Sequence, residues 1–256
     1  MTMRFLSFLM LFGMLMFIQK TRKGQEKGMK RNKKSKKWAG VGVLAAFIVW
    51  TVLIQVVDVQ PIGPNETEVG FAALNGWFHE MTGVHWMLYV VTDWMGLVPL
   101  AVCAGFGFIG LTQWIQRKNL MTVDADILLL GAYYVAVIAA YLLFEQFSIN
   151  YRPVLVEGRL EASYPSSTTL LVLGVMSTWG FQVERRIRSK PISKALRIIS
   201  ACFSAFMVVG RLLSGVHWLT DIIGAVLLSM GMFLIYRGAV LRIDARERKR
   251  KQIGTA

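Results

Sequence analysis

The chain has 256 residues, of which 55% are hydrophobic and only 17% are charged. A soluble domain carries about 25% charged residues, and a disordered chain is far less apolar, so the composition argues against both classes. The formal net charge is +14, yet several apolar runs are long enough to cross a bilayer. We therefore predict an all-α polytopic membrane protein whose positive charge flanks its spans.

The first 37 residues, 1–37, are predicted to form a basic cytoplasmic N-terminal segment. Within it, the apolar stretch at residues 5–18 is too short for a membrane span. No small-residue cleavage site follows, and the chain is strongly basic from Lys20 onward, which disfavours a secretory signal peptide. We interpret the stretch as an accessory, interfacial segment; a start of the chain at Met29 is the alternative.

Six apolar stretches predict a bundle of six transmembrane helices, which defines a membrane domain over residues 38–236. Most have about the length that a helix needs to cross a bilayer, and the fourth is short. The second could begin earlier, near Trp86. Glycine, serine and threonine recur within them, as close helix contacts in lipid require. The predicted spans are Trp38–Val57, Trp94–Ile115, Ile127–Phe147, Ser167–Val183, Ala195–Leu213 and Trp218–Tyr236.

Most of the 29 lysines and arginines fall on one side of these spans. The positive-inside rule makes that side the cytoplasm, with both termini in it. We expect the N-terminal segment and the basic tail at 237–256 to contact anionic lipid headgroups. Nucleic acid is not an expected partner, because no soluble domain would present a groove-reading element. The segments predicted on the opposite side are 58–85, 148–166 and 214–217.

Three arginines, Arg152, Arg159 and Arg211, lie at this outer edge of the membrane. Ionisable groups at such a depth are candidates for a functional site, and guanidinium groups suit phosphate oxygens. His217 and Asp221 follow Arg211, and in a helix their spacing of four residues places both on one face. A carboxylate there can hold an imidazole in one tautomer and stabilise its cation.

The start of the fourth predicted span is a further candidate for anion binding. A helix N-terminus presents free backbone N–H groups and the positive end of the helix dipole. Three hydroxyl side chains stand there, those of Ser166, Ser167 and Thr168. We therefore predict that these residues bind the substrate together with Arg152.

The order and spacing of these residues resemble the signature of the type 2 phosphatidic acid phosphatase (PAP2) superfamily. That signature has three parts, K-x6-R-P, P-S-G-H and S-R-x5-H-x3-D. The third part is specific, whereas the first two would be weak alone. The matching segments are Tyr151-Arg152-Pro153, Pro165-Ser166-Ser167 and Arg211-x5-His217-x3-Asp221.

The resemblance implies an integral membrane lipid phosphatase that needs no metal or other cofactor. It assigns the catalytic roles to His217, Asp221 and Arg211. His217 would attack phosphorus and become a phosphohistidine, and Asp221 would support it. Arg152 and Arg211 would clamp the phosphate, and Ser166 would bind one of its oxygens. The substrate would be a membrane lipid phosphate held at the extracytoplasmic face, with the inner membrane of a bacterium as the expected location.

Three positions depart from the family pattern. The lysine of the first part is Glu145, the histidine of the second part is Thr168, and the serine of the third part is Gly210. The family histidine protonates the leaving oxygen, and the loss of a positioned acid costs about 10²–10⁴-fold in rate. His79 or His85 could replace that acid, although both lie far upstream.

Other charged residues near the outer edge have structural interpretations. We favour Glu145 as an ion-pair partner within the membrane, for example of Arg152 or Arg159. Asp93 is interpreted as an anchor of the second span. Arg159 is expected to contact solvent, headgroups, or the nearby Glu157 and Glu161.

We therefore expect a lipid phosphate or diphosphate phosphatase, with polyprenyl diphosphate as one substrate. A phosphate leaving group is already a stable anion, so the loss of the acid at Thr168 favours diphosphates over phosphate monoesters. Two alternatives stay open. The protein could be a catalytically impaired family member that binds phospholipids, or a phosphotransferase in which a lipid or sugar acceptor replaces water.

Overall fold

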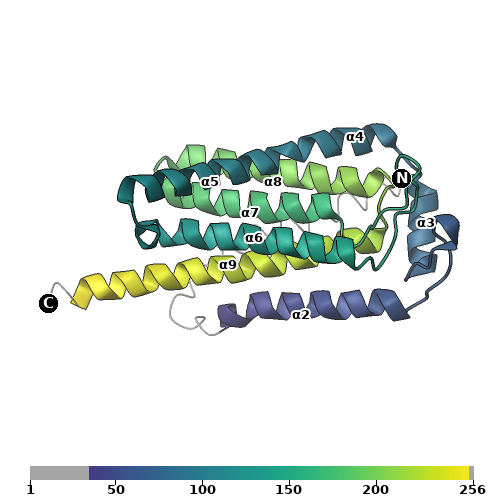
Figure 1. Cartoon of the computed structure of the whole chain (residues 1–256), viewed down its shortest axis with the longest axis horizontal. Coiled ribbons are helices and arrows are strands. Elements are labelled where there is room, and N and C mark those ends of the chain that lie inside the picture. The colour runs from purple at the N-terminus through teal and green to yellow at the C-terminus, as the bar shows by residue number, and fades with distance from the viewer. Residues whose placement is uncertain (1–34, 254–256) are drawn as a thin grey trace.

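The computed structural model describes residues 35–253, so the predicted apolar stretch at 5–18 lies outside the described residues. This part of the chain is helical, with isolated bridges in place of extended strands. Its α-helices run side by side in a long bundle (Figure 1). They are α2 (Ser35–Val56), α3 (Ala72–Thr82), α4 (Trp86–Met95), α5 (Leu97–Arg117), α6 (Ala125–Gln146), α7 (Ser167–Arg186), α8 (Lys190–Leu213) and α9 (Leu219–Ile253), with 3-10 turns η1 (Pro64–Glu66) and η2 (Leu120–Thr122).

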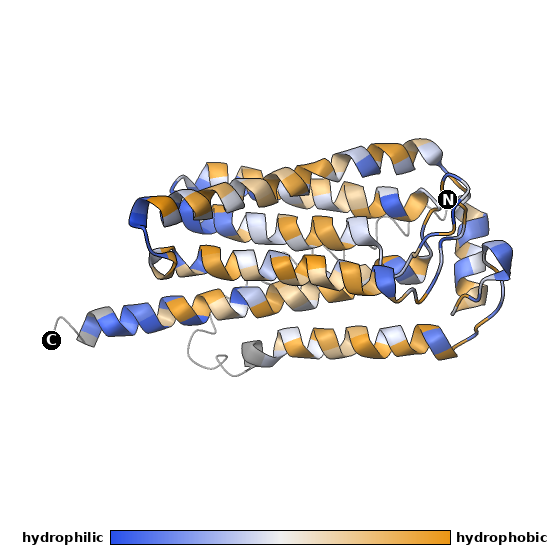
Figure 2. Cartoon of the chain, viewed as in Figure 1, coloured by the Kyte–Doolittle hydropathy of each residue, from blue (hydrophilic) through white to orange (hydrophobic). Residues whose placement is uncertain are grey.

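Five segments of the described chain are long and apolar enough to cross a membrane. Hydrophobic residues predominate along the helices of the bundle, and hydrophilic residues gather toward its two ends (Figure 2). The protein is therefore an all-α integral membrane protein, as predicted. The five segments are Trp38–Val56, Trp86–Arg117, Ala125–Gln146, Lys190–Leu213 and Leu219–Arg250.

The second span differs from its predicted start at Trp94. Helix α4 begins at Trp86, and α5 follows directly after Gly96, so the two helices form one long apolar segment. Gly96 itself keeps a helical conformation and its N–H bonds to the carbonyls of Thr92 and Asp93. The earlier of the two starts considered from the sequence is the one observed.

Helix α7, the fourth predicted span, is present but is not apolar enough to count among the five. It packs against α5, α6, α8 and α9, and its polar side chains bond inside the bundle. Thr178 Oγ1 donates to the Val175 carbonyl at 2.7 Å, and Gln182 Nε2 donates to the Tyr236 hydroxyl at 2.7 Å. Because α7 faces protein, its composition does not have to match lipid.

Helix α2 lies along α9 at the edge of the bundle (Figure 1). Glycines allow the two backbones to approach closely, as is typical of helix contacts in membranes. A Cβ atom on Gly231 would stand 2.6 Å from the Leu44 side chain, and one on Gly40 would stand 2.8 Å from that of Ile235. The remaining faces of α2 carry exposed apolar residues such as Ile48.

Helix α9 does not end at Tyr236, the predicted end of the last span. It continues to Ile253 and includes most of the predicted basic tail. Lysine, arginine and glutamate are good helix formers, and Arg185 of α7 binds Asp244 of α9 through two hydrogen bonds of 2.6 and 3.0 Å. The charged part of α9 is therefore an extension of the bundle.

The loops at the opposite end position the site. The connection from α6 to α7 folds back on itself through bridges between Tyr151 and Ala162 and between Val156 and Arg159. The connection from α8 to α9 is short and packs against the α3–α4 connection, where the His85 N–H donates to the Ser214 carbonyl at 3.0 Å. These loops bring residues from distant parts of the chain to the same end.

Candidate active site

His217 lies in the tight turn between α8 and α9 and is buried, with 3% of its surface exposed. Gly215 turns the backbone with a φ of +71°, which favours glycine. A Cβ atom there would come within 2.2 Å of the Gly83 carbonyl oxygen. This turn therefore sets the position of His217 through backbone geometry.

One nitrogen of the His217 ring is bound and the other is free. Nδ1 lies 3.2 Å from the Ser163 carbonyl oxygen and 3.1 Å from its Oγ. Because a carbonyl only accepts, we infer that Nδ1 carries the hydrogen. Nε2 is buried and has no hydrogen-bond partner in the described part of the chain. Its lone pair is then available for attack.

The charge state of His217 supports this assignment. Burial lowers the pKa of the imidazole well below its usual range, and the positive charges of Arg152 and Arg211 lower the pKa further. Burial disfavours a charged form, and a nearby like charge does the same. The ring is therefore neutral at neutral pH, which is the form a nucleophilic histidine requires.

Asp221 reaches His217 mainly through Ser163. The Asp221 carboxylate lies 3.9 Å from Nδ1, too far for a hydrogen bond. Ser163 Oγ donates to Asp221 Oδ2 at 2.5 Å, and the Trp218 N–H donates to the same oxygen at 2.9 Å. Asn150 Nδ2 lies 3.3 Å from Oδ1. The two side chains thus lie close together, as the four-residue spacing predicted, although His217 precedes the first residue of α9 and the hydrogen bonds run through Ser163.

Arg211 is buried in the last turn of α8, with 2% of its surface exposed. Its Nη2 donates to Asp93 Oδ1 at 2.9 Å and to Thr168 Oγ1 at 2.6 Å. Asp93 is therefore an ion-pair partner of Arg211, beyond the anchoring role inferred from sequence. Arg211 Nε has no partner among the described residues.

Arg152 converges with Arg211 on one aromatic ring, that of Tyr89 in α4. The guanidinium carbons of Arg152 and Arg211 lie 5.9 and 4.8 Å from the ring centroid, which are cation–π distances. Arg152 Nε lies 3.1 Å from Glu161 Oε2, and Nη1 has no partner in the described chain. The two cations can therefore be held close together before any anion binds.

The interpretation of Glu145 as an ion-pair partner is not supported. Arg152 pairs with Glu161, and no ion pair of Glu145 occurs in the described part of the chain. Arg159 is exposed, in the turn with Val156.

The hydroxyl groups at the start of α7 have separate partners. Ser166 is buried, and its Oγ donates to Thr169 Oγ1 at 3.1 Å. Thr168 is held by Arg211 Nη2, and Ser167 lines the cavity described below. Of these three, Ser167 is thus the residue best placed to meet a ligand.

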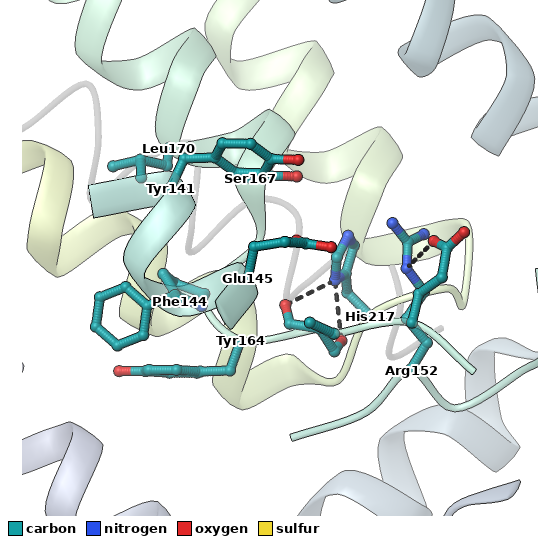
Figure 3. A pocket seen from close by; sticks show the side chains of 12 residues that line it. Tyr141, Phe144, Glu145, Arg152, Tyr164, Ser167, Leu170 and His217 are labelled. Carbon is teal, nitrogen blue, oxygen red and sulfur yellow. Dashed lines mark hydrogen bonds and ion pairs between the residues drawn. The ribbon is translucent and has the colours of Figure 1, made fainter. Parts of the chain in front are cut away.

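A cavity of about 220 Å³ opens beside His217 and Arg152 (Figure 3). Ser163, Glu161 and Glu145 contribute polar groups to its wall. Its apolar wall is formed by Tyr141, Phe144, Tyr164, Pro165 and Leu170. A polar pocket with an adjoining apolar wall suits a phosphate headgroup attached to a hydrocarbon chain.

Sequence reasoning missed Ser163, Tyr89 and Asn150. Serine, tyrosine and asparagine are common at membrane edges, so their types carry little information. Their contacts with His217, the two arginines and Asp221 come from folding alone. Within residues 35–253, no group of three or more histidine, cysteine or acidic residues is arranged to hold a metal ion.

Comparison with known proteins adds independent information. The PAP2 superfamily model matches residues 130–243. No curated protein matches the chain significantly. The fold is similar to the crystal structure of a transmembrane PAP2-type phosphatidylglycerolphosphate phosphatase from Bacillus subtilis, with a TM-score of 0.56 and 15% identity, over 81% of this chain and 97% of that chain.

The matched residues include all three signature segments and every predicted site residue. At 15% identity the structural similarity shows the fold, and the family assignment rests on the sequence match. The resemblance predicted from the motifs is confirmed by a match of residues 130–243 to the PAP2 superfamily model, and the fold is similar to that of a membrane PAP2-type phosphatase.

Proposed function

We propose that the protein is a membrane lipid phosphate or diphosphate phosphatase that acts through a phosphohistidine at His217. The observation that carries this proposal is the neutral, unpartnered Nε2 of His217 beside a cavity that Arg152 also lines. A nucleophile, fixed positive charge and a helix N-terminus at one place are the components that phosphoryl transfer requires.

The first step would form a bond from His217 Nε2 to phosphorus while the bond from phosphorus to the leaving oxygen breaks. Arg152 and Arg211 would stabilise the negative charge on the phosphoryl oxygens. The ring gains positive charge, and its Nδ1–H faces Ser163, which is bonded to the Asp221 carboxylate. Water would then hydrolyse the phosphohistidine and release phosphate.

Thr168 supports a preference for lipid diphosphates. Its hydroxyl oxygen accepts from Arg211, and a threonine hydroxyl is a poor acid in place of the family histidine. An alcohol leaving group needs a proton, whereas a phosphate leaving group needs it far less. We therefore propose a lipid diphosphate such as a polyprenyl diphosphate as the substrate.

The distribution of basic residues supports the proposed location of the site at the extracytoplasmic face. The site loops stand at one end of the bundle, while Arg117, Arg185, Arg186 and the basic extension of α9 stand at the other (Figure 1). This distribution follows the positive-inside rule, with both termini in the cytoplasm. A bacterial inner membrane is the setting that we propose.

A second candidate function is phospholipid binding without turnover. This candidate is favoured because both arginines already form ion pairs with carboxylates. Asp93 pairs with Arg211, and Glu161 pairs with Arg152. A phosphate must displace or share these partners. The phosphotransferase alternative predicts a phosphorylated acceptor as product in place of inorganic phosphate.

Phosphate release by the purified protein tests the proposal. We expect release from a polyprenyl diphosphate and labelling of the protein by a terminal ³²P-phosphate. His217→Ala should abolish both signals. Equal or faster release from a phosphatidic acid of similar chain length would contradict the diphosphate preference, and lipid binding without release or labelling would favour the second candidate.

A further inference from the structure

Hydrolysis of the phosphohistidine, the second half of the proposed reaction, requires an activated water molecule. Hydrolysis of a phosphohistidine is faster when a base takes the proton of the attacking water. Thr168, which replaces the family histidine, is bonded to Arg211 and lacks a basic group. A base must therefore come from another element.

Glu145 stands in the right cavity for this role. It is the penultimate residue of α6, and its side chain lines the same cavity as His217 and Arg152. In Figure 3 its carboxylate extends toward the His217 ring. It forms no ion pair in the described part of the chain, because Arg152 pairs with Glu161. A water molecule in the liquid takes up about 30 Å³, so a cavity of about 220 Å³ has room for a phosphate and a water.

The other titratable residues near the site are less suited. Glu161 also lines the cavity, but Arg152 Nε holds it at 3.1 Å. Tyr141 and Tyr164 carry phenol groups, which are poor bases in their neutral form. His79 stacks on Trp218 with ring centroids 5.5 Å apart, and His85 Nε2 lies 2.8 Å from the Thr82 carbonyl oxygen. Neither histidine lines the cavity.

We propose that the Glu145 carboxylate is the general base for hydrolysis of the phosphohistidine. The proposal rests on the proposed function. A bond forms between the water oxygen and phosphorus, and the bond between phosphorus and Nε2 breaks. One water proton moves to the Glu145 carboxylate, the bonding pair returns to Nε2, and phosphate leaves. Glu145, which is exposed near the end of α6, would then pass its proton to water.

In this arrangement the proton-transfer group has moved from α7 to α6. The family places a histidine at the α7 start and a lysine at the α6 end, whereas this chain has Thr168 and Glu145. The loss of the histidine at position 168 would then be compensated by the glutamate at position 145. Because the base acts after the leaving group has departed, the preference for diphosphates remains.

A rapid-quench experiment with a terminally ³²P-labelled polyprenyl diphosphate tests the proposal. Wild-type protein should release phosphate and hold little label in the steady state. Glu145→Gln should slow turnover by about 10²-fold or more and accumulate label close to one phosphate per protein. Glu157→Gln, at an exposed position in the loop between α6 and α7, is the matched control and should behave as wild type. His217→Ala should carry no label.

The possible outcomes distinguish a failure of the proposed role of Glu145 from a failure of the proposed phosphatase function. Wild-type turnover that depends on His217, with no label accumulating on Glu145→Gln, would overturn the role of Glu145 alone. Accumulation of label on Glu161→Gln, and not on Glu145→Gln, would also overturn the role of Glu145. No turnover and no label in the wild type would overturn the proposed function, and this inference with it. If Glu145→Gln does not fold, Glu145→Asp should slow dephosphorylation while labelling stays fast, and equal slowing of both steps would refute the proposal.

Discussion

One serine, Ser163, connects the imidazole of His217 to the carboxylate of Asp221. Ser163 presents its carbonyl and its hydroxyl to His217 Nδ1, and the same hydroxyl donates to Asp221. In the proposed mechanism the carboxylate would therefore stabilise the positive charge that develops on the ring, through an intermediate hydrogen bond. Because all three residues are buried, these bonds are stronger than they would be in water.

Removal of the Ser163 hydroxyl should slow catalysis while substrate binding persists. A hydrogen bond to a charged group contributes about 1.5–3 kcal/mol, which corresponds to about a ten- to hundredfold change in rate. Ser163→Ala should therefore lower kcat by this factor with little change in KM, and Ser163→Thr should recover part of the loss. An unchanged kcat in Ser163→Ala would show that Asp221 acts without the serine.

The pH dependence of activity should reflect the depressed pKa of His217. Burial and the two arginines lower that pKa, so the ring stays neutral, and competent, below the usual histidine pKa of about 6.5. The acid limb of kcat/KM should lie below that pH. Arg152→Gln removes a positive charge that lowers the pKa of His217. When kcat/KM of this variant is normalised to its maximum and plotted against pH, its fall on the acid side should therefore move to higher pH. A limb that moves to lower pH, or stays fixed, would contradict the assignment.

At the scale of elements, close backbone contact holds α2 against α9. Gly231 and Gly40 stand where the two helices meet, and their missing side chains permit the approach. Behind this contact, Phe47 of α2 and Phe144 of α6 pack on Tyr164, which lines the site cavity. The packing of α2 is thus connected to the wall of the site.

Substitution of Gly231 by valine should separate the two helices. The added Cβ atom would meet Leu44 at 2.6 Å, and overpacking of this kind costs about 1–3 kcal/mol. Gly238→Val in the same helix is the matched control, because no atom lies within 4 Å of a Cβ atom there. We expect a lower Tm in detergent for Gly231→Val than for Gly238→Val. Equal melting temperatures would show that this contact contributes little to stability.

At the scale of the whole molecule, polar chemistry is divided between the two ends of an apolar bundle. One end carries the site, and the other end carries an ion-pair network of Asp124, Asp126, Arg185 and Arg186 with the charged part of α9. α7, which connects the two ends, is buried by its neighbours. We therefore expect a lipid headgroup to reach the site from one leaflet only.

The orientation can be measured with single cysteines on a background without Cys103 and Cys202. Glu157→Cys lies in the outer loop and Lys118→Cys lies in the loop between α5 and α6. In intact cells an impermeant maleimide should label Glu157→Cys, and Lys118→Cys should react only after the membrane is opened. The reverse pattern would place the site in the cytoplasm.

The sequence by itself determined the class of the protein, the approximate spans and the signature residues. These follow from local properties: apolar length, charge next to spans, and rare ionisable residues at the membrane edge. Tertiary structure decided the rest, because it depends on contacts between distant segments. Ser163 became the connection between Asp221 and His217, and Tyr89 the contact shared by the two arginines. Among the described residues, Glu145 faces the cavity without an ion pair, and Glu161, brought back by the folded loop, is the residue that reaches Arg152.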